Sequence, residues 1–140
     1  MTQEALKLEK KLDASPEAVF DAWTNPEQMA GWFSPMTTAS IPVMELRPGG
    51  DYRIDMHGDG KDYVHTGKYI EVERPGRLKF SWHSEGTGQK ETIVTIDIAP
   101  DGDGSRLTLT HEKLPTEQSR DEHEKGWMVI LEKLGDVFAA

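Results

Sequence analysis

Hydrophobic and polar residues alternate along much of the chain, with the period of two that is typical of strands in a half-buried sheet. The clearest examples are residues 52–57 and 78–83, where every second side chain is large and apolar. Turns that contain glycine separate such segments, and the short connections between consecutive strands imply antiparallel pairing. The strands that this pattern predicts cover residues 7–12, 52–57, 63–73, 78–83, 92–98 and 107–111.

Helical signals interrupt the alternation near the N-terminus. The dipeptides Ser15-Pro16 and Asn25-Pro26 each place a capping residue before a proline, which is favoured at the first position of a helix. They predict two short helices in succession. The two prolines and several Ser and Thr residues in the next segment predict a loop over residues 34–42.

The last segment of the chain changes to a helical period. Apolar side chains recur there three and four residues apart, which predicts a helix of about 20 residues with one apolar stripe. Thr116 and Ser119 are both suitable N-cap residues. Gly126 lies inside this helix, where glycine costs about 1 kcal/mol relative to alanine, so it suggests that something makes close contact with the helix there. The stripe consists of Trp127, Ile130, Leu131, Leu134, Val137 and Phe138.

This order of elements, with helices and strands segregated along the chain, predicts an α+β fold. One apolar face per strand and one apolar helix stripe place the long helix across the concave face of a bent sheet. We expect a curved antiparallel sheet of about six to seven strands that grips the C-terminal helix, with two short helices after the first strand. The chain of 140 residues shows no repeat and no long linker, so residues 1–140 are expected to form a single domain.

Composition and charge limit the kinds of site and partner that the protein can have. The absence of cysteine excludes disulfides, thiolate catalysis and cysteine-ligated metal centres. The formal net charge is −9 and no run of basic residues is present, so we expect no nucleic-acid partner and no membrane partner. No apolar run approaches the roughly 20 residues that cross a bilayer, and the N-terminus lacks an apolar signal core, so a cytoplasmic location is expected.

Five stretches of the chain carry a further signal in their motifs, order and spacing. They are Val19–Pro26 with Gly31-Trp32-Phe33, Glu45–Tyr52, Gly67–Val72 with Leu78–Trp82, Leu107–Glu112, and His123–Trp127. Together they resemble the START-like helix-grip superfamily, and more narrowly the bacterial single-domain proteins related to the C-terminal domain of the activator of the 90-kDa heat-shock chaperone's ATPase. The resemblance covers essentially the whole chain. Because that fold serves lipid carriers, hormone receptors, cyclases and chaperone regulators, the resemblance implies several functions.

The inner faces of the predicted elements suggest a binding cavity. A long helix over a curved sheet leaves a space with mostly apolar walls, which suits a small-molecule site. The alternative is that the same side chains simply fill this space as a core. The candidate ligand-binding residues are Trp32, Phe33, Tyr52, Ile54, Met56, Phe80, Trp82, Leu109, His111, His123, Trp127 and Leu131.

The histidines divide into two groups. His111 continues the apolar face of the last strand and His123 lies beside the apolar stripe of the C-terminal helix, so both are expected to face inward. There they would orient the polar end of a ligand, take part in acid–base catalysis, or serve as core residues satisfied by one hydrogen bond. The others, His57, His65 and His83, are expected on strand faces away from the apolar set.

Metal and covalent chemistry are not expected. No two histidines have metal-ligand spacing, and Arg106 stands where a calcium loop beginning at residue 101 would need a glycine. No Gly-x-Ser-x-Gly motif or phosphate-binding loop is present. Asp55, Asp97 and Glu112 are expected to point to solvent. No catalytic residue, metal or cofactor is therefore assigned.

The sequence thus favours a domain that binds a small, apolar or lipid-like ligand between the sheet and the C-terminal helix, as a monomer or weak dimer. Two alternatives stay open. One is a regulator similar to the activator of the heat-shock chaperone ATPase, with a chaperone as its partner. The other is a cavity enzyme of the cyclase or isomerase type.

Overall fold

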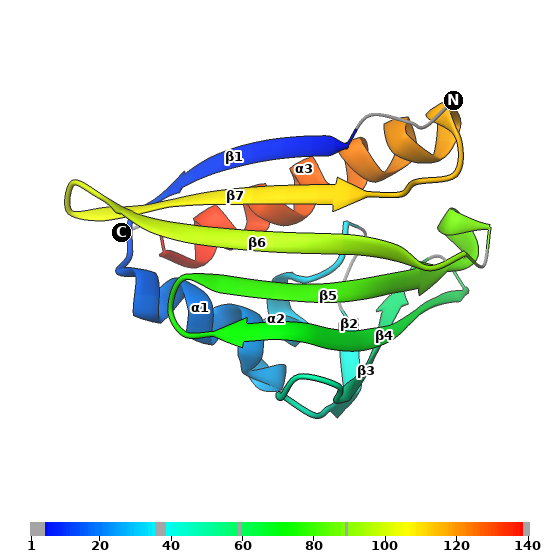
Figure 1. Ribbon diagram of the computed structural model, residues 1–140, viewed down its shortest axis with the longest axis horizontal. Coiled ribbons are helices and arrows are strands. Elements are labelled where there is room, and N and C mark those ends of the chain that lie inside the picture. Colours follow the sequence, from blue (N-terminus) through cyan, green and yellow to red (C-terminus); the bar gives the residue numbers. More distant parts are fainter. Residues whose placement is uncertain (1–4, 36–38, 59, 89, 139–140) are drawn as a thin grey trace.

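A computed structural model describes residues 5–35, 39–58, 60–88 and 90–138. In this part of the chain seven strands form one sheet in the order β1-β7-β6-β5-β4-β3-β2, so β1 and β2 are its edges (Figure 1). The elements in chain order are β1 (Leu6–Leu12), α1 (Pro16–Thr24), α2 (Pro26–Trp32), β2 (Ala39–Met44), β3 (Asp51–His57), β4 (Asp62–Glu73), β5 (Arg77–Ser84), the 3₁₀ helix η1 (Glu85–Thr87), β6 (Thr92–Asp101), β7 (Gly104–Glu112) and α3 (Glu117–Phe138).

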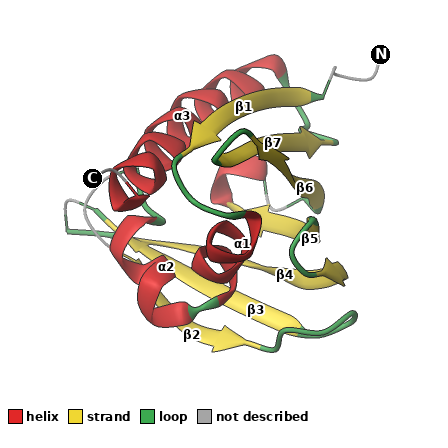
Figure 2. Cartoon of the chain, turned by 90° about the vertical axis from the view of Figure 1, so that its left-hand side faces the viewer, coloured by secondary structure: helices red, strands yellow, loops and turns green. Residues whose placement is uncertain are grey.

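The sheet is antiparallel throughout and carries the helices on one face. Strands β2 to β7 pair in sequence order, and β1 joins the far edge by pairing with β7, where Leu8 lies opposite Leu109. Helix α3 runs behind β1, β7 and β6 in Figure 1, and Figure 2 shows the sheet curving around the helices. This arrangement confirms the predicted α+β helix-grip architecture.

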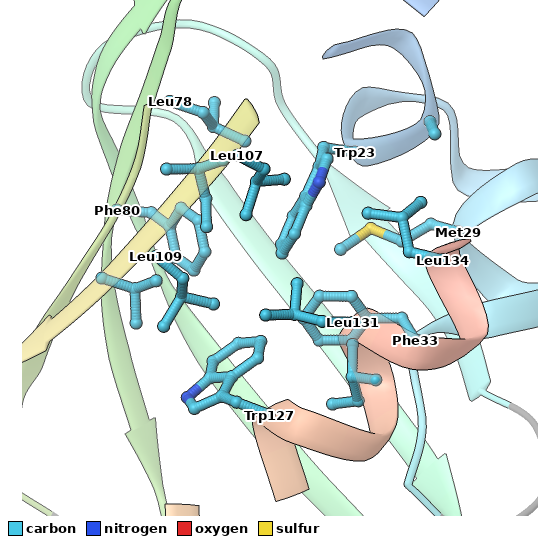
Figure 3. Close-up of a cluster of buried hydrophobic side chains, with 14 of the residues drawn as sticks. Trp23, Met29, Phe33, Leu78, Phe80, Leu107, Leu109, Trp127, Leu131 and Leu134 are labelled. Carbon is cyan, nitrogen blue, oxygen red and sulfur yellow. The ribbon is translucent and has the colours of Figure 1, made fainter. Parts of the chain in front are cut away.

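The core lies between the concave face of the sheet and the three helices (Figure 3). Phe80 and Leu109 from the sheet face Leu131 from α3, and all three side chains are buried. Trp23 of α1 closes this layer with an edge-on contact to Phe33, with 5.5 Å between ring centroids. Burial of each such side chain contributes roughly 1.5–3 kcal/mol, so this layer fixes α3 on the sheet.

The helix starts follow the capping residues in the sequence. Ser15 Oγ accepts a hydrogen bond from the Ala18 amide at 3.2 Å, and Asn25 Oδ1 accepts one from the Glu27 amide at 3.0 Å. Thr116, the earlier of the two expected caps of α3, accepts from the Ser119 amide at 3.0 Å. In the described residues, no helix combines the length and hydropathy needed to cross a membrane.

The predicted loop over residues 34–42 is wrong in its second half, because Ala39–Met44 form the edge strand β2. Its pairing with β3 shifts register between Ser40 and Val43, which brackets Pro42. Proline lacks an N–H group and is tolerated in a sheet only at edges and bulges. Pro42 therefore marks an edge strand with a bulge, and residues 36–38 of the predicted loop lie outside the described residues.

The expected close contact at Gly126 is also wrong. A Cβ atom built at this position meets nothing within 4 Å apart from the helix itself and its chain neighbours. The glycine therefore leaves open space on α3.

Candidate functional site

A pocket of about 410 Å³ opens between α3 and the end of the sheet formed by β3, β4 and β5. This volume lies within the range of small-molecule sites. Glu85 and Glu122 are exposed and mark its rim, whereas Trp82 and Trp127 are buried in its wall. The pocket is lined by Pro35, Met56, Tyr63, His65, Trp82, Ser84, Glu85, Glu122, His123, Gly126, Trp127 and Ile130.

Aromatic rings form the deep wall of the pocket. The ring centroids of Trp82 and Trp127 are 5.1 Å apart, and the His65 ring lies 4.6 Å from Trp82. Phe33 lies against both indoles, at 6.0 Å from Trp82 and 5.6 Å from Trp127. Since each ring is held by others, the wall is a fixed apolar surface of inclined rings.

Behind this wall, His111 is fully buried and its hydrogen bonds define its tautomer. The Trp127 indole N–H donates to His111 Nδ1 at 3.1 Å, so Nδ1 carries no proton. His111 Nε2–H then donates to Thr92 Oγ1 at 2.7 Å, and the Thr92 hydroxyl donates to the Trp82 carbonyl at 2.7 Å. Burial, and secondarily His123, lowers the pKa of His111 to about 3, so its ring is neutral at pH 7.

Two further imidazoles line the pocket itself. His65 Nδ1 is 3.1 Å from the Tyr63 carbonyl and His123 Nδ1 is 2.7 Å from the Ser119 carbonyl. A carbonyl oxygen only accepts, so both rings carry their proton on Nδ1 and present Nε2 as an acceptor. Burial lowers the pKa of His65 to about 4 and lowers that of His123 as well, against the opposing effect of those carbonyls.

The charge at the rim is negative. Glu85 is paired with Lys61, whose Nζ lies 3.0 and 3.3 Å from the two carboxylate oxygens. Glu122 accepts a hydrogen bond from Gln118 Nε2 at 2.9 Å, and none of the described lysines or arginines forms an ion pair with it. No lysine or arginine contributes to the pocket lining in the described part of the chain.

The structure separates the predicted ligand-binding residues into two groups. Those that line the pocket are Met56, Trp82, His123 and Trp127. The remainder are buried in the core without lining it: Trp32, Phe33, Tyr52, Ile54, Phe80, Leu109, His111 and Leu131. Around Tyr52, Ile54 and Phe80 the remaining void is only about 10 Å³, too small for a ligand.

The expectation that His65 lies away from the apolar set is wrong. It pairs with Ile54 on one side and Ser84 on the other, and these residues share the inner face. A bulge between Tyr69 and Glu71 changes which alternate side chains of β4 face inward. The alternation in the sequence therefore does not assign one face to the whole strand. Tyr63, which precedes the bulge like His65, reaches the pocket for the same reason.

Among the lining residues that the sequence analysis did not assign to a site, Gly126 carried a signal in the sequence. A glycine inside a long helix lowers helix stability, so its presence indicates that a larger side chain is unfavourable at that position. It does not show whether the position borders another part of the protein or a cavity. Pro35, Ser84, Glu85 and Glu122 carried no comparable signal, because their part in the lining depends on how α3 sits on the sheet.

The outer face of the sheet holds a hydrogen-bonded series of three side chains. Ser40 Oγ lies 2.7 Å from His57 Nε2, and His57 Nδ1 lies 2.7 Å from Asp62 Oδ1. This order matches a hydrolytic triad, but such chemistry also needs donors for an oxyanion and a site for the substrate. The lining of the pocket contains none of the three, since they lie on the opposite face of the sheet.

The remaining polar candidates lie outside the pocket. His83 is half-buried on the outer face of β5, and Asp97 pairs with Arg77 there at 2.7 Å. Asp55 binds Arg53 at 2.8 Å on the outer face of β3, and Glu112 is exposed. In the described ranges, no group of three or more His, Asp or Glu side chains is placed to hold a metal ion.

The curved sheet, the long gripping helix and the pocket between them define a helix-grip domain of the START-like class. The family described as Activator of Hsp90 ATPase homolog 1-like protein matches residues 13–139. The chain therefore belongs to this family. None of the proteins with curated descriptions matches it.

Solved bacterial structures share this fold over nearly the whole chain. The protein CV1439 from Chromobacterium violaceum has 25% sequence identity and a TM-score of 0.88, with 96% of each chain covered. AHSA1 (SPO3351) from Silicibacter pomeroyi has 25% identity and a TM-score of 0.78, also with 96% of each chain covered. CalU16 from Micromonospora echinospora has 27% identity and a TM-score of 0.74, covering 96% of this chain and 76% of its own.

Proposed function

We propose that this protein binds a small, largely apolar molecule in the pocket between α3 and strands β3 to β5. The observation that carries this proposal is a space of about 410 Å³ against a wall of buried indoles. Trp82 and Trp127 are held by neighbouring rings, so the apolar surface exists before a ligand arrives. A preformed surface lowers the entropic cost of binding.

The glycine in α3 supports the same function. Gly126 borders the pocket and a Cβ there would enter open space. Alanine at this position would favour the helix by about 1 kcal/mol, so the chain gives up stability to keep the space open. A packed core gains nothing from such a residue, whereas a binding site does.

Mass spectrometry of the purified protein, under native conditions and after denaturation, tests the proposal. We expect an additional mass that denaturation releases, and we expect Gly126→Leu to lose it because the side chain fills the pocket. Gly31→Leu is the matched control: Gly31 is also helical, its Cβ also meets nothing within 4 Å, and it is not in the pocket lining. A bare chain mass in the unsubstituted protein, or an extra mass that Gly126→Leu retains, would contradict the proposal.

A second candidate function is regulation of a chaperone ATPase, with the chaperone as partner. The observation in its favour is the match of residues 13–139 to a family described as similar to an activator of the Hsp90 ATPase. Measurement of the ATPase rate of a purified Hsp90-type chaperone, with and without this protein, tests it directly. An unchanged rate would count against this function and leave the pocket proposal intact.

A further inference from the structure

We propose that the ligand of this pocket carries a basic or hydrogen-bond-donating nitrogen on an apolar body, and that carboxylates and phosphates are rejected. This inference rests on the proposed binding function and specifies its ligand class. It follows from three properties of the pocket: fixed acceptors, a rim carboxylate that forms no ion pair with the described lysines and arginines, and an aromatic wall.

The acceptors are the Nε2 atoms of His65 and His123. Their Nδ1 protons are committed to the carbonyls of Tyr63 and Ser119 at 3.1 and 2.7 Å. Neither Nε2 has a hydrogen-bond partner among the described residues. A ligand N–H group satisfies such atoms, whereas a carboxylate oxygen would face two lone pairs.

Donors for an anion are scarce in the lining. The Trp82 indole N–H is unpartnered among the described residues but shielded from solvent, and that of Trp127 is used by His111. The hydroxyls of Ser84 and Tyr63 donate and accept equally well. The lining residues that the structure describes therefore offer an anion no fixed donor that it can reach.

The rim charge acts in the same direction. Lys61 neutralises Glu85 and lies 4.9 Å from the Tyr63 ring centroid, but it does not line the pocket. Glu122 lines the pocket and forms no ion pair with the described lysines and arginines, so it attracts a protonated amine and repels an acid. A protonated amine is also attracted to indole and phenol faces by the cation–π interaction.

The experiment measures binding of three naphthalene probes that differ only in the head group: the methylamine, the methanol and the carboxylate. Isothermal titration calorimetry at pH 7 is expected to give an affinity at least about tenfold higher for the amine than for the acid, with the alcohol between them. Equal or tighter binding of the acid would overturn the inference while leaving the proposed function standing.

Substitutions test whether Glu122, His65 and His123 cause the preference for the amine probe. Glu122→Gln is expected to lower the amine affinity about three- to fivefold without affecting the alcohol. Glu132→Gln is the matched control, with the same charge change at an exposed position roughly 15 Å further along α3. An equal effect of both substitutions would show that only the overall charge matters, and would contradict the site.

The acceptors are tested by His65→Phe and His123→Phe, which keep a ring and remove Nε2. Each is expected to lower the affinities of the amine and the alcohol about fivefold. The affinity of the carboxylate probe is not expected to fall. Unchanged amine binding in both variants would overturn the role of the imidazoles. If no probe binds but native mass spectra show a released cellular ligand, the ligand class is wrong and the proposed function holds; if neither is seen, both fail.

Discussion

At the scale of single residues, the indoles divide the core into two environments. Trp127 donates its N–H to the buried His111 ring, whereas the Trp23 N–H has no partner among the described residues although that side chain is also buried. The Trp127 bond orients the His111 ring, and through Thr92 the series of bonds continues to the carbonyl of Trp82. This series of bonds fixes the Trp127 indole from behind and links it to the backbone of β5 at Trp82.

The value of that bond can be measured against a matched substitution. Trp127→Phe and Trp23→Phe both replace a buried indole by a smaller phenyl ring, but only the first leaves a buried acceptor, His111 Nδ1, without its donor. We expect Trp127→Phe to lower the free energy of unfolding by about 1–2 kcal/mol more than Trp23→Phe does. Urea denaturation of the two variants gives this difference, and equal losses would show that the bond contributes nothing.

The sequence predicted that His111 faces inward but not what it does there. An inward histidine suits ligand contact, catalysis and core packing alike, and the choice depends on neighbours distant in the sequence. Thr92 and Trp127 come from another strand and from α3, and they occupy both ring nitrogens. His65 is the opposite case. It lines the pocket, but a bulge in its strand interrupts the alternation of apolar and polar residues, so the pattern did not show that it faces inward.

At the scale of elements, α3 decides where the pocket lies. Its buried stripe of Trp127, Ile130, Leu131 and Leu134 packs on the sheet, while the turn that holds His123 and Gly126 borders open space. The helix is thus a pocket wall in its N-terminal part and a core element in its C-terminal part, and Trp127 and Ile130 serve as both. The strand and helix patterns predicted this element well, since apolar periodicity reports which face is covered.

The open space at Gly126 gives a stability prediction. Gly126→Ala is expected to raise the free energy of unfolding by about 1 kcal/mol, because alanine favours the helix and its Cβ meets nothing within 4 Å. In contrast, Gly67→Ala should destabilise the protein, since a Cβ there would overlap the Ser81 carbonyl oxygen. Thermal unfolding checks both, and a loss of stability in Gly126→Ala would mean that the pocket wall is closed at this point.

At the scale of the whole molecule, a curved sheet grips the helix and leaves the core filled at one end and open at the other. The void around Tyr52 and Phe80 is about 10 Å³, and the pocket beside Trp82 and Trp127 is about 410 Å³. The sequence predicted the architecture because each strand has one apolar face. It did not locate the pocket, because inner-face residues look alike whether they meet each other or a space, and the difference depends on sheet curvature and helix placement.

The most direct test of the account is an NMR titration that follows the indole N–H signals of the four tryptophans. The ligand is the neutral naphthalene methanol, whose binding does not depend on the charge argument. We expect the signals of Trp82 and Trp127 to move in proportion to occupancy, and those of Trp23 and Trp32, which do not line the pocket, to stay in place. Movement of Trp23 and Trp32 instead, or of no indole at ligand saturation, would contradict binding in this pocket.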